Sequence, residues 1–353
     1  MKEFTITEDF PKSEIEFDLR FLNPSACYDY LFSLKWPNGF VCKKCKNENY
    51  WISKRQLYIC TTCEHQHSLT AGTIMDSSKK PITYWFKAMW WFTTRRSGVN
   101  AVNLKELLGF GSYDTAWHWL QKLRRCTIRK DREKLSERVE VDEFVIGGQK
   151  SGKRGRGAEG KTIVAVAVER CDQKKRIGRI RLQVILDYSA YSLETFFTEN
   201  IQPGSNIATD SWSSYSSIVK EQYHHVLTNQ SKADKDHDSL YDVHLIASLV
   251  KRQIRGTFQG RFEPKYLQNY LDEYVFRFNR RKSKYIGKKF MRIVQRVVKS
   301  SKLNGIKSSG ISILSQNFYH WSFLGNRIRF FDSQLFVCVV KPHSIMRKPA
   351  LSQ

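Results

Sequence analysis

The residues with the most distinctive chemistry are four cysteines in two close pairs, Cys42 with Cys45 and Cys60 with Cys63, separated by fourteen residues. Each Cys-x2-Cys turn can offer two thiolates to one ion, and Zn²⁺ prefers four soft ligands in a tetrahedron. The spacing therefore predicts a zinc ribbon with one structural Zn²⁺ ion. The competing interpretations are two disulfides or unpaired thiols. We expect His65 and His67, which follow the second pair, to lie on the hairpin surface.

A second group of residues could bind divalent cations for catalysis. Asp142 lies in a segment with strand alternation, and Asp210 ends another such segment. Two adjacent carboxylates repel each other, but a pair of Mg²⁺ or Mn²⁺ ions neutralises them and promotes in-line attack at phosphorus. His244 begins a helical segment and is the third ligand that we expect. Lys251, seven residues later, shares its helical face and could contact a phosphate.

Each of these residues also has a structural interpretation. An aspartate at a strand end is often a turn or capping residue, and a single histidine on a helix is usually structural. Asp238 and Asp242 precede His244 and are alternative third ligands. Strand alternation places Glu143, the neighbour of Asp142, on the opposite face of the sheet, so we expect it to lie outside the site.

The elements that must position the two aspartates follow the order of a ribonuclease-H-like domain. Residues 139–148, 161–170 and 176–186 have the composition of three antiparallel strands. A helix, two short strands and two further helices follow, at 189–201, 205–210, 223–229, 243–257 and 264–281. In a mixed sheet of this order the first and fourth strands are neighbours, so Asp142 and Asp210 converge.

Before these strands, the sequence predicts a helical region. Residues from Pro81 onward repeat aromatic and apolar side chains at helical spacing, and we interpret this stripe as buried core rather than as a platform for base stacking. Two further helical segments flank a turn at Gly109 and Gly111, in the pattern of a helix-turn-helix. The second helix of that motif enters the major groove by its N-terminal end.

Basic and polar side chains in these regions are candidates for contact with DNA. On the second helix, Thr115 and His118 are candidates for reading bases. Phosphate contacts are expected from Lys122, Arg124, Arg125 and the basic hairpin tip with Lys153, Arg154 and Arg156. A solvated basic linker is the alternative interpretation of the run that follows the second helix.

Charge and length limit the classes of protein that fit. The chain has 353 residues and a net charge of +25, from 59 Lys and Arg against 34 Asp and Glu. Such an excess indicates a polyanionic partner, either nucleic acid or an anionic membrane surface. The apolar runs are too short to span a bilayer, and the N-terminus lacks the pattern of a secretory signal. We therefore expect a cytoplasmic protein, associated with the nucleoid in a bacterium, with no membrane partner.

Several ordered blocks give the chain a resemblance to a known family. Between about Trp36 and Arg281 it resembles the zinc-ribbon insertion-sequence transposases of the family numbered 1595, which have an ISXO-type DDE transposase domain. The blocks are WPNGFVCKKCKN, YICTTCEHQHSLTAGTIM, VEVDEFVIGG, GAEGKTIVAVAVE, ATDSWSSY, VHLIASLVKRQIRGTFQG and YLDEYVFRFNRR. The resemblance implies a DNA transposase with Asp142 and Asp210 as acidic ligands. It aligns the third ligand with His244, a DDH variant, and the basic residue that follows with Lys251.

The sequence departs from this pattern in two ways. A histidine in place of the usual glutamate removes one negative charge and replaces a hard oxygen ligand with an imidazole. The chain also continues past the family pattern in a basic extension, for which we expect a strand-rich piece that binds DNA or promotes oligomerisation.

We therefore predict a multidomain α+β protein. Its regions are an N-terminal helical segment, a zinc ribbon, a helix-turn-helix, a ribonuclease-H-like domain and the extension, at residues 1–35, 36–78, 79–136, 137–285 and 286–353. The predicted activity is binding of terminal inverted repeats by a homo-oligomer, cleavage of the strand, and transfer of the 3′-hydroxyl into double-stranded target DNA. The alternatives are a structure-specific nuclease and a non-catalytic DNA-binding regulator derived from a transposase.

Overall fold

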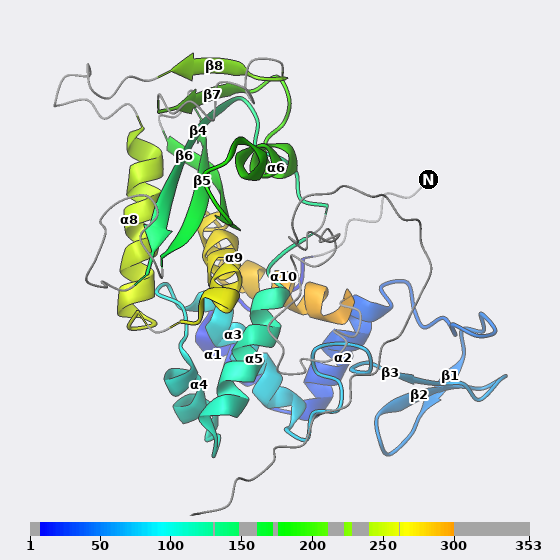
Figure 1. Ribbon diagram of the computed structural model, residues 1–353. Coiled ribbons are helices and arrows are strands. Elements are labelled where there is room, and N and C mark those ends of the chain that lie inside the picture. The colour runs from blue at the N-terminus through cyan, green and yellow to red at the C-terminus, as the bar shows by residue number, and fades with distance from the viewer. Residues whose placement is uncertain are drawn as a thin grey trace, which may run out of the picture. The chain divides into compact units, whose positions relative to one another are not determined.

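The computed structural model describes residues 8–129, 131–147, 161–171, 176–210, 222–227, 240–260 and 262–299. The chain divides into two compact units, residues 1–309 and 310–353, and all described residues belong to the first. None of the helices in these ranges is both long enough and apolar enough to cross a membrane. The first unit has a helical part, a small three-stranded sheet and a larger five-stranded sheet, and Figure 1 shows how these parts are arranged.

The helical part contains α1 to α5 and α10, which come from both ends of the first unit. Their bounds are Glu14–Arg20, Pro24–Lys35, Ile82–Thr94, Ala101–Leu108, Tyr113–Arg125 and, for α10, Gly287–Lys299. Side chains of α3 are buried on most of its circumference, and Trp85 stacks on Trp119 of α5 with ring centroids 3.6 Å apart. The prediction that the aromatic stripe is core is therefore confirmed for these residues.

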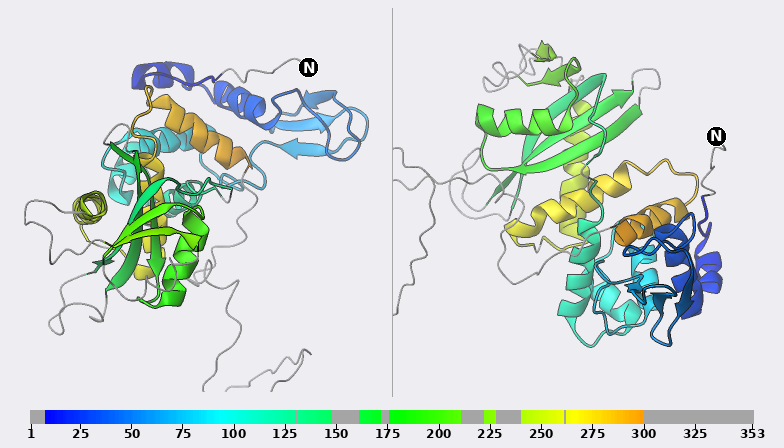
Figure 2. Two further views of the ribbon diagram at one scale, coloured as in Figure 1. Left: turned by 90° about the horizontal axis from the view of Figure 1, so that it is seen from above. Right: turned by 90° about the vertical axis from the view of Figure 1, so that its right-hand side faces the viewer.

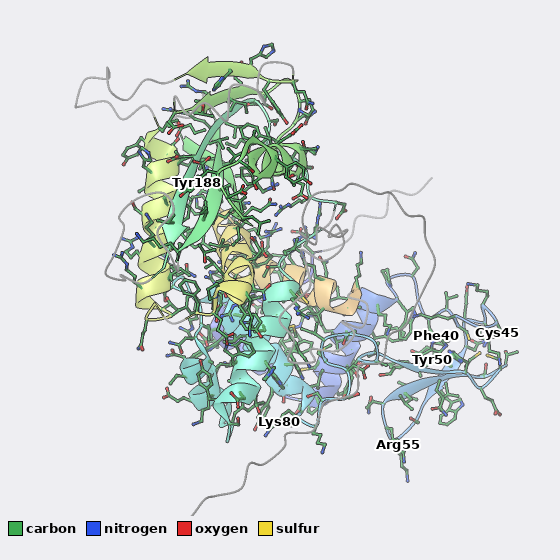
Figure 3. The ribbon with its side chains drawn as sticks, in the orientation of Figure 1. Phe40, Cys45, Tyr50, Arg55, Lys80 and Tyr188 are labelled. Carbon is green, nitrogen blue, oxygen red and sulfur yellow. The ribbon has the colours of Figure 1, made fainter. Side chains whose placement is uncertain are left out.

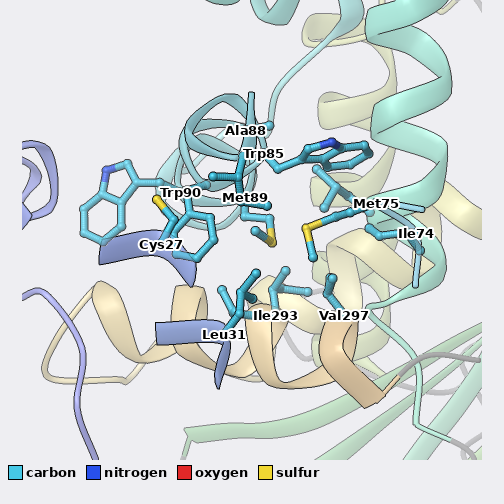
Figure 4. Packing of buried hydrophobic residues seen from close by; sticks show 14 of the residues in the cluster. Cys27, Leu31, Ile74, Met75, Trp85, Ala88, Met89, Trp90, Ile293 and Val297 are labelled. Atoms are coloured by element: carbon cyan, nitrogen blue, oxygen red, sulfur yellow. The ribbon is translucent and has the colours of Figure 1, made fainter. Parts of the chain in front are cut away.

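Helix α10 closes this core from the far end of the sequence. Its apolar side chains recur three and four residues apart, the spacing of a single buried helical face. Phe290 contacts Trp90 of α3 with ring centroids 5.6 Å apart. Figure 4 shows Ile293 and Val297 of α10 in one cluster with the α3 side chains and Leu31 of α2. The first helix of the predicted basic extension is thus an integral part of the N-terminal helical core.

The small sheet consists of β1 (Tyr50–Ile52), β2 (Leu57–Cys60) and β3 (Gln66–Ser68), which pair antiparallel in that order. It packs on α2, where Phe32 has ring contacts at 5.6 Å to Tyr50 and 5.1 Å to Tyr58. Figure 3 shows Phe40 and Tyr50 close together at this small sheet, and it labels Arg55, which lies in the turn between β1 and β2.

The larger sheet has the strand order β6-β5-β4-β7-β8. Its strands span Arg138–Ile146 (β4), Thr162–Cys171 (β5), Arg176–Ile185 (β6), Asn206–Thr209 (β7) and His224–Leu227 (β8). The first three pair antiparallel, whereas β7 is parallel to both β4 and β8. This mixed sheet agrees with the predicted ribonuclease-H-like order and confirms that the first and fourth strands of the domain are neighbours.

Helices cover both faces of the larger sheet. Helix α6 (Ala190–Asn200) packs on the face that carries Val139 and Val141, and α8 (Tyr241–Gly256) packs on the face that carries Phe144 and Ile146. Helix α9 (Leu267–Phe278), preceded by the 3-10 turn η2 (Pro264–Tyr266), shares the face of α8. Figures 1 and 2 show α6 and α8 on opposite sides of the sheet. Even-numbered residues of β4, including Asp142, therefore face α8.

A buried ion pair joins the helical part to the larger sheet and its helices. Arg124 Nε of α5 lies 2.7 Å from Glu273 Oε2 of α9, and both side chains are at most 1% exposed. Arg277, one turn later on α9, also pairs with Glu273. Removing one partner of such a pair would leave a buried charge uncompensated, which costs about 3–5 kcal/mol.

Candidate metal centres and nucleic-acid interface

The four cysteines meet at one end of the small sheet. Their sulfur atoms all lie within 4.8 Å of one another, with Cys42 Sγ 3.6 Å from Cys63 Sγ and Cys45 Sγ 3.4 Å from Cys60 Sγ. A tetrahedral zinc site with Zn–S bonds of about 2.3 Å requires sulfurs about 3.8 Å apart, so this donor set fits Zn²⁺. All four thiols are free, which excludes the two disulfides considered above.

The local environment favours ionised sulfur at Cys60. Burial opposes ionisation of the Cys60 thiol, but hydrogen bonds from the backbone N–H of Cys63 and from the Asn47 amide outweigh it and lower the pKa of Cys60 to about 6. The thiolate is the form that binds zinc. Asn47, which follows the first Cys-x2-Cys turn, is thus a supporting residue that the spacing of the cysteines does not reveal.

The surface position expected for His67 is wrong. His67 is only 5% exposed, and its Nε2 lies 3.4 Å from Cys42 Sγ. It is the middle residue of β3, and strand alternation turns it into the ribbon, where its ring packs against Phe40 with centroids 5.1 Å apart. His65, two residues earlier, is exposed as expected.

The second centre lies where β4 meets the first turn of α8. Asp142 Oδ2 is 3.3 Å from His244 Nε2, and the two side chains are 19% and 40% exposed. Two ligands of one octahedral Mg²⁺ ion are about 3 Å apart when the metal–ligand distance is about 2.1 Å. This pair therefore fits two positions around one divalent cation. Both residues line a cavity of about 440 Å³.

Asp210 is related to this pair by the register of the sheet and not by a shared cavity. Strands β4 and β7 are in parallel register, with Glu140 opposite Ala208, so the same register continued by two residues brings Asp210 level with Asp142. Asp210 is half-buried directly after β7, and it is not among the residues that line the cavity. In the described part of the chain, only the four cysteines form a group of three or more potential metal ligands at such short mutual distances.

Lys251 lines the same cavity two turns after His244, as predicted from helical spacing. Its Nζ lies 5.4 Å from the centroid of the Phe144 ring. Burial lowers the pKa of this ammonium, and so does the charge of Arg255, whereas Asp142 raises it. The Lys251 ammonium, in the same cavity as Asp142, is therefore suited to binding a phosphate group next to the candidate metal ligands.

Glu140 is the supporting residue of this centre that sequence analysis missed. Its buried carboxylate accepts hydrogen bonds from the backbone N–H groups of Asp242, at 3.1 Å, and Val243, at 3.3 Å. It also accepts one from Arg170 at 3.2 Å. Glu140 thus fixes the first turn of α8, which carries His244. Burial, followed by the charge of Asp242, raises the pKa of Glu140. Its position two residues before Asp142 was the available signal, because the two share a strand face.

The structure describes one of the two alternative third ligands, Asp242, and not the other, Asp238. The Asp242 carboxylate faces Arg170, with 3.9 Å between Oδ2 and Nε, whereas Asp238 lies outside the described residues. Glu143 also lines the cavity, so the prediction that it lies outside the site is not confirmed. Three further side chains lining the cavity were not predicted: Lys161, Tyr188 and Ser248. Figure 3 labels Tyr188 beside the larger sheet.

The candidate DNA-reading helix α5 begins after a turn at Gly109, which has φ +59°, and is capped by Ser112. Thr115 is half-buried and His118 is exposed. Lys122 and Arg125 are half-buried, and Lys122 Nζ lies 5.9 Å from the Trp85 ring centroid. The hairpin-tip residues Lys153, Arg154 and Arg156 lie outside the described residues.

The phosphate contact expected for Arg124 is wrong in this structure. Its side chain is 1% exposed and is held by Glu273 in the buried ion pair described above. Helical periodicity explains the error: Arg124 lies on the same face of α5 as the buried residues Leu120 and Gln121. Helical spacing was the available sequence signal for this burial, whereas the partner Glu273 lies on a distant helix.

Comparison with known families and structures adds independent information. Residues 134–279 match the family model described as the ISXO2-like transposase domain, and residues 22–66 match the transposase zinc-ribbon domain. Comparison with curated proteins gives no match. One similar structure is described as the cryoEM structure of the simian T-cell lymphotropic virus intasome in complex with PP2A regulatory subunit B56 gamma. It is 13% identical, with a TM-score of 0.30, over 67% of this chain and 85% of that chain.

Proposed function

Because the chain belongs to the zinc-ribbon insertion-sequence transposases of the family numbered 1595, we propose that it cuts the ends of its element and joins the freed 3′-hydroxyl to target DNA. The observation that carries this proposal is the pairing of Asp142 with His244, at 3.3 Å, in a cavity that also contains Lys251. The proposal is supported by the position of Asp210, which directly follows β7, the strand that pairs with the Asp142 strand β4.

Each residue has a role that follows from its position. Asp142 and His244 provide an oxygen and a nitrogen ligand on neighbouring elements, and Asp210 provides the second carboxylate from the residue that follows β7. Lys251 binds the phosphate next to the reacting bond, and Glu140 positions the first turn of α8. Two Mg²⁺ or Mn²⁺ ions, when bound, would activate the attacking water or 3′-hydroxyl and stabilise the leaving oxygen.

The parts of the chain outside this centre would bind DNA. The zinc ribbon and the α4–α5 pair are the candidates for recognising terminal inverted repeats, with Thr115 and His118 reading bases. Lys122 and Arg125 remain candidates for phosphate contacts, whereas Arg124 has a structural role. We further propose that the active form on DNA is a homo-oligomer, because two element ends must be joined together to one target.

The decisive experiment is strand transfer with pre-cut, labelled element ends and a target plasmid in Mg²⁺ or Mn²⁺. Wild type should join the ends, and Asp142→Ala and Asp210→Ala should each lose at least about a thousandfold in rate while still binding the ends. Uncut ends are assayed in parallel, and their cleavage without joining of the pre-cut ends would indicate a nuclease on the same scaffold. Binding without either reaction would indicate a DNA-binding regulator.

A further inference from the structure

A second cavity in the described residues lies away from the proposed catalytic centre. It has a volume of about 910 Å³ and is formed between the segment that joins α3 to α4 and the helices α8 and α9. The polar side chains that define it are Arg95, Arg96, Asn100, Arg252, Gln253 and Tyr274. We call this site the arginine groove.

All charged side chains that line the arginine groove are basic. Three arginines line it and no aspartate or glutamate does. Arg95 is held in place by Glu14, with 3.2 Å between Nη2 and Oε1, and by the Trp91 ring, 4.3 Å from its guanidinium carbon. Arg96 and Arg252 are exposed, and no ion pair among the described residues holds either of them. Two planar guanidinium groups are therefore available to an anionic ligand.

The backbone on one side of the groove is fixed to α8. Thr257 Oγ1 donates to the carbonyl of Ser97 at 2.7 Å, and Asn100 Nδ2 donates to the carbonyl of Thr257 at 3.2 Å. Gly98 has φ +83°, and a Cβ there would lie 2.8 Å from Nη2 of Arg277, the partner of the buried Glu273. The groove is thus built on hydrogen bonds and close packing, so binding there requires little ordering of the loop.

Helix α8 connects the groove to the catalytic cavity. Its residues His244, Ser248 and Lys251 line the cavity, whereas Leu249, Arg252 and Gly256 line the groove. Lys251 and Arg252 are consecutive and point about 100° apart around the helix. From His244 to Arg252 the helix rises about 12 Å, the length of three to four base-pair steps of duplex DNA at about 3.4 Å each.

We propose that the arginine groove binds the sugar–phosphate backbone of duplex DNA a few base pairs from the phosphate that reacts at Asp142. Guanidinium groups match phosphate oxygens in a bidentate manner and carry no base preference, so the site positions DNA without reading its sequence. The inference rests on the proposed function, since the reacting phosphate defines where the duplex must run.

The test is DNA binding by the full chain carrying Arg96→Ala and Arg252→Ala together. Fluorescence anisotropy with a labelled duplex of about 30 base pairs should show a Kd raised by about tenfold, and a salt dependence reduced by nearly one unit of slope for each lost contact. The double variant Arg96→Lys, Arg252→Lys keeps both charges but not the bidentate geometry, so it should restore the salt dependence and only part of the affinity. Thermal unfolding of all variants verifies that the fold is retained.

Arg255→Ala is the matched control, because Arg255 is an exposed arginine of α8 that lines neither cavity. It should bind nearly as wild type does. Equal binding by the groove variant and wild type, or an equal loss in Arg255→Ala, would overturn the inference. Strand transfer assayed in parallel separates the two proposals. If wild type transfers strands and the groove variant binds DNA as tightly as wild type, the proposed function stands and the groove inference is wrong. If the groove variant loses DNA binding but wild type transfers no strands, the groove inference stands and the proposed function is wrong.

Discussion

The two metal centres differ in how the chain assembles them. The ribbon brings four sulfurs within 4.8 Å of one another using only residues 42–63, on two turns next to a small sheet. The proposed catalytic centre draws Asp142, Asp210 and His244 from three parts of the chain spread over about a hundred residues, and Asp142 lies 3.3 Å from His244.

This difference reflects what each centre must do. A structural zinc site is complete when four ligands surround the ion, so local sequence spacing is sufficient to specify it. A catalytic site must leave coordination positions open for the reacting phosphate and water, and its ligands are therefore distributed around a cavity. Substitutions should therefore affect a closed centre and an open centre differently.

Cys60→Ser should remove the zinc ion and unfold the ribbon, because metal binding contributes about 10 kcal/mol or more to the folding of such sites. Elemental analysis should find one zinc per wild-type chain and none in the variant. Cys27→Ser is the control, since Cys27 is a buried cysteine of α2 outside the cluster. A wild-type protein purified without zinc would contradict the closed-site assignment.

His244→Ala should lower the cleavage rate by at least about a hundredfold, because an open centre has few ligands to spare. His244→Glu should keep activity and shift its preference from Mn²⁺ toward Mg²⁺, which favours oxygen ligands. The measurement is single-turnover cleavage in each metal. Asp242→Asn is the control, since its carboxylate faces Arg170. An inactive Asp242→Asn beside an active His244→Ala would show that Asp242 is the third ligand.

Asp272 of α9 sharpens the comparison, because it is a buried carboxylate that is assigned to no metal. Its Oδ2 has no hydrogen-bond partner among the described residues, and burial raises its pKa from 3.8 to about 7. Between these values the folded state keeps a proton that the unfolded state has lost, so stability falls as the pH rises from about 4 to about 7.

Asp272→Asn should therefore raise the free energy of unfolding by up to about 4 kcal/mol at pH 8 and change it little at pH 4. Urea denaturation at both pH values measures the difference. Glu273→Gln is the contrasting variant, because Glu273 is ionised and paired with Arg124, and its substitution should destabilise the protein. A uniform effect of Asp272→Asn at both pH values would show that its proton is not linked to folding.

The smallest effect concerns Lys251 in the open centre. Burial lowers the pKa of its ammonium, so the charge is lost at a lower pH than for an exposed lysine. The cleavage rate should fall by about fivefold, or about 1 kcal/mol, as the pH rises through this lowered pKa. Lys251→Arg keeps its charge and should flatten the alkaline part of the pH profile. Identical profiles for the two proteins would remove Lys251 from the phosphate contact.

The sequence predicted what depends on local spacing and strand order. The cysteine ligands follow from two short turns, and the contact of Asp142 with His244 follows from the strand order and the start of α8. The errors concern residues whose environment comes from distant segments. Arg124 is neutralised by a glutamate of α9, and His67 is covered by aromatic residues of the ribbon. The periodicity of one helix or strand does not reveal which other segment of the chain contacts a given side chain.

Because α10 packs in the N-terminal core, this core can be completed only after residues 287–299 have been synthesised. Trp90 and Phe290 touch across 200 residues of sequence. At about 5–20 residues per second, a ribosome needs about 10–40 s to synthesise the intervening chain. During that interval the aromatic face of α3 lacks its cover, and the nascent chain exposes it to chaperones and to other nascent chains. A fragment that stops before α10 would keep this exposed face permanently, so expression boundaries for the N-terminal part must include residues 287–299.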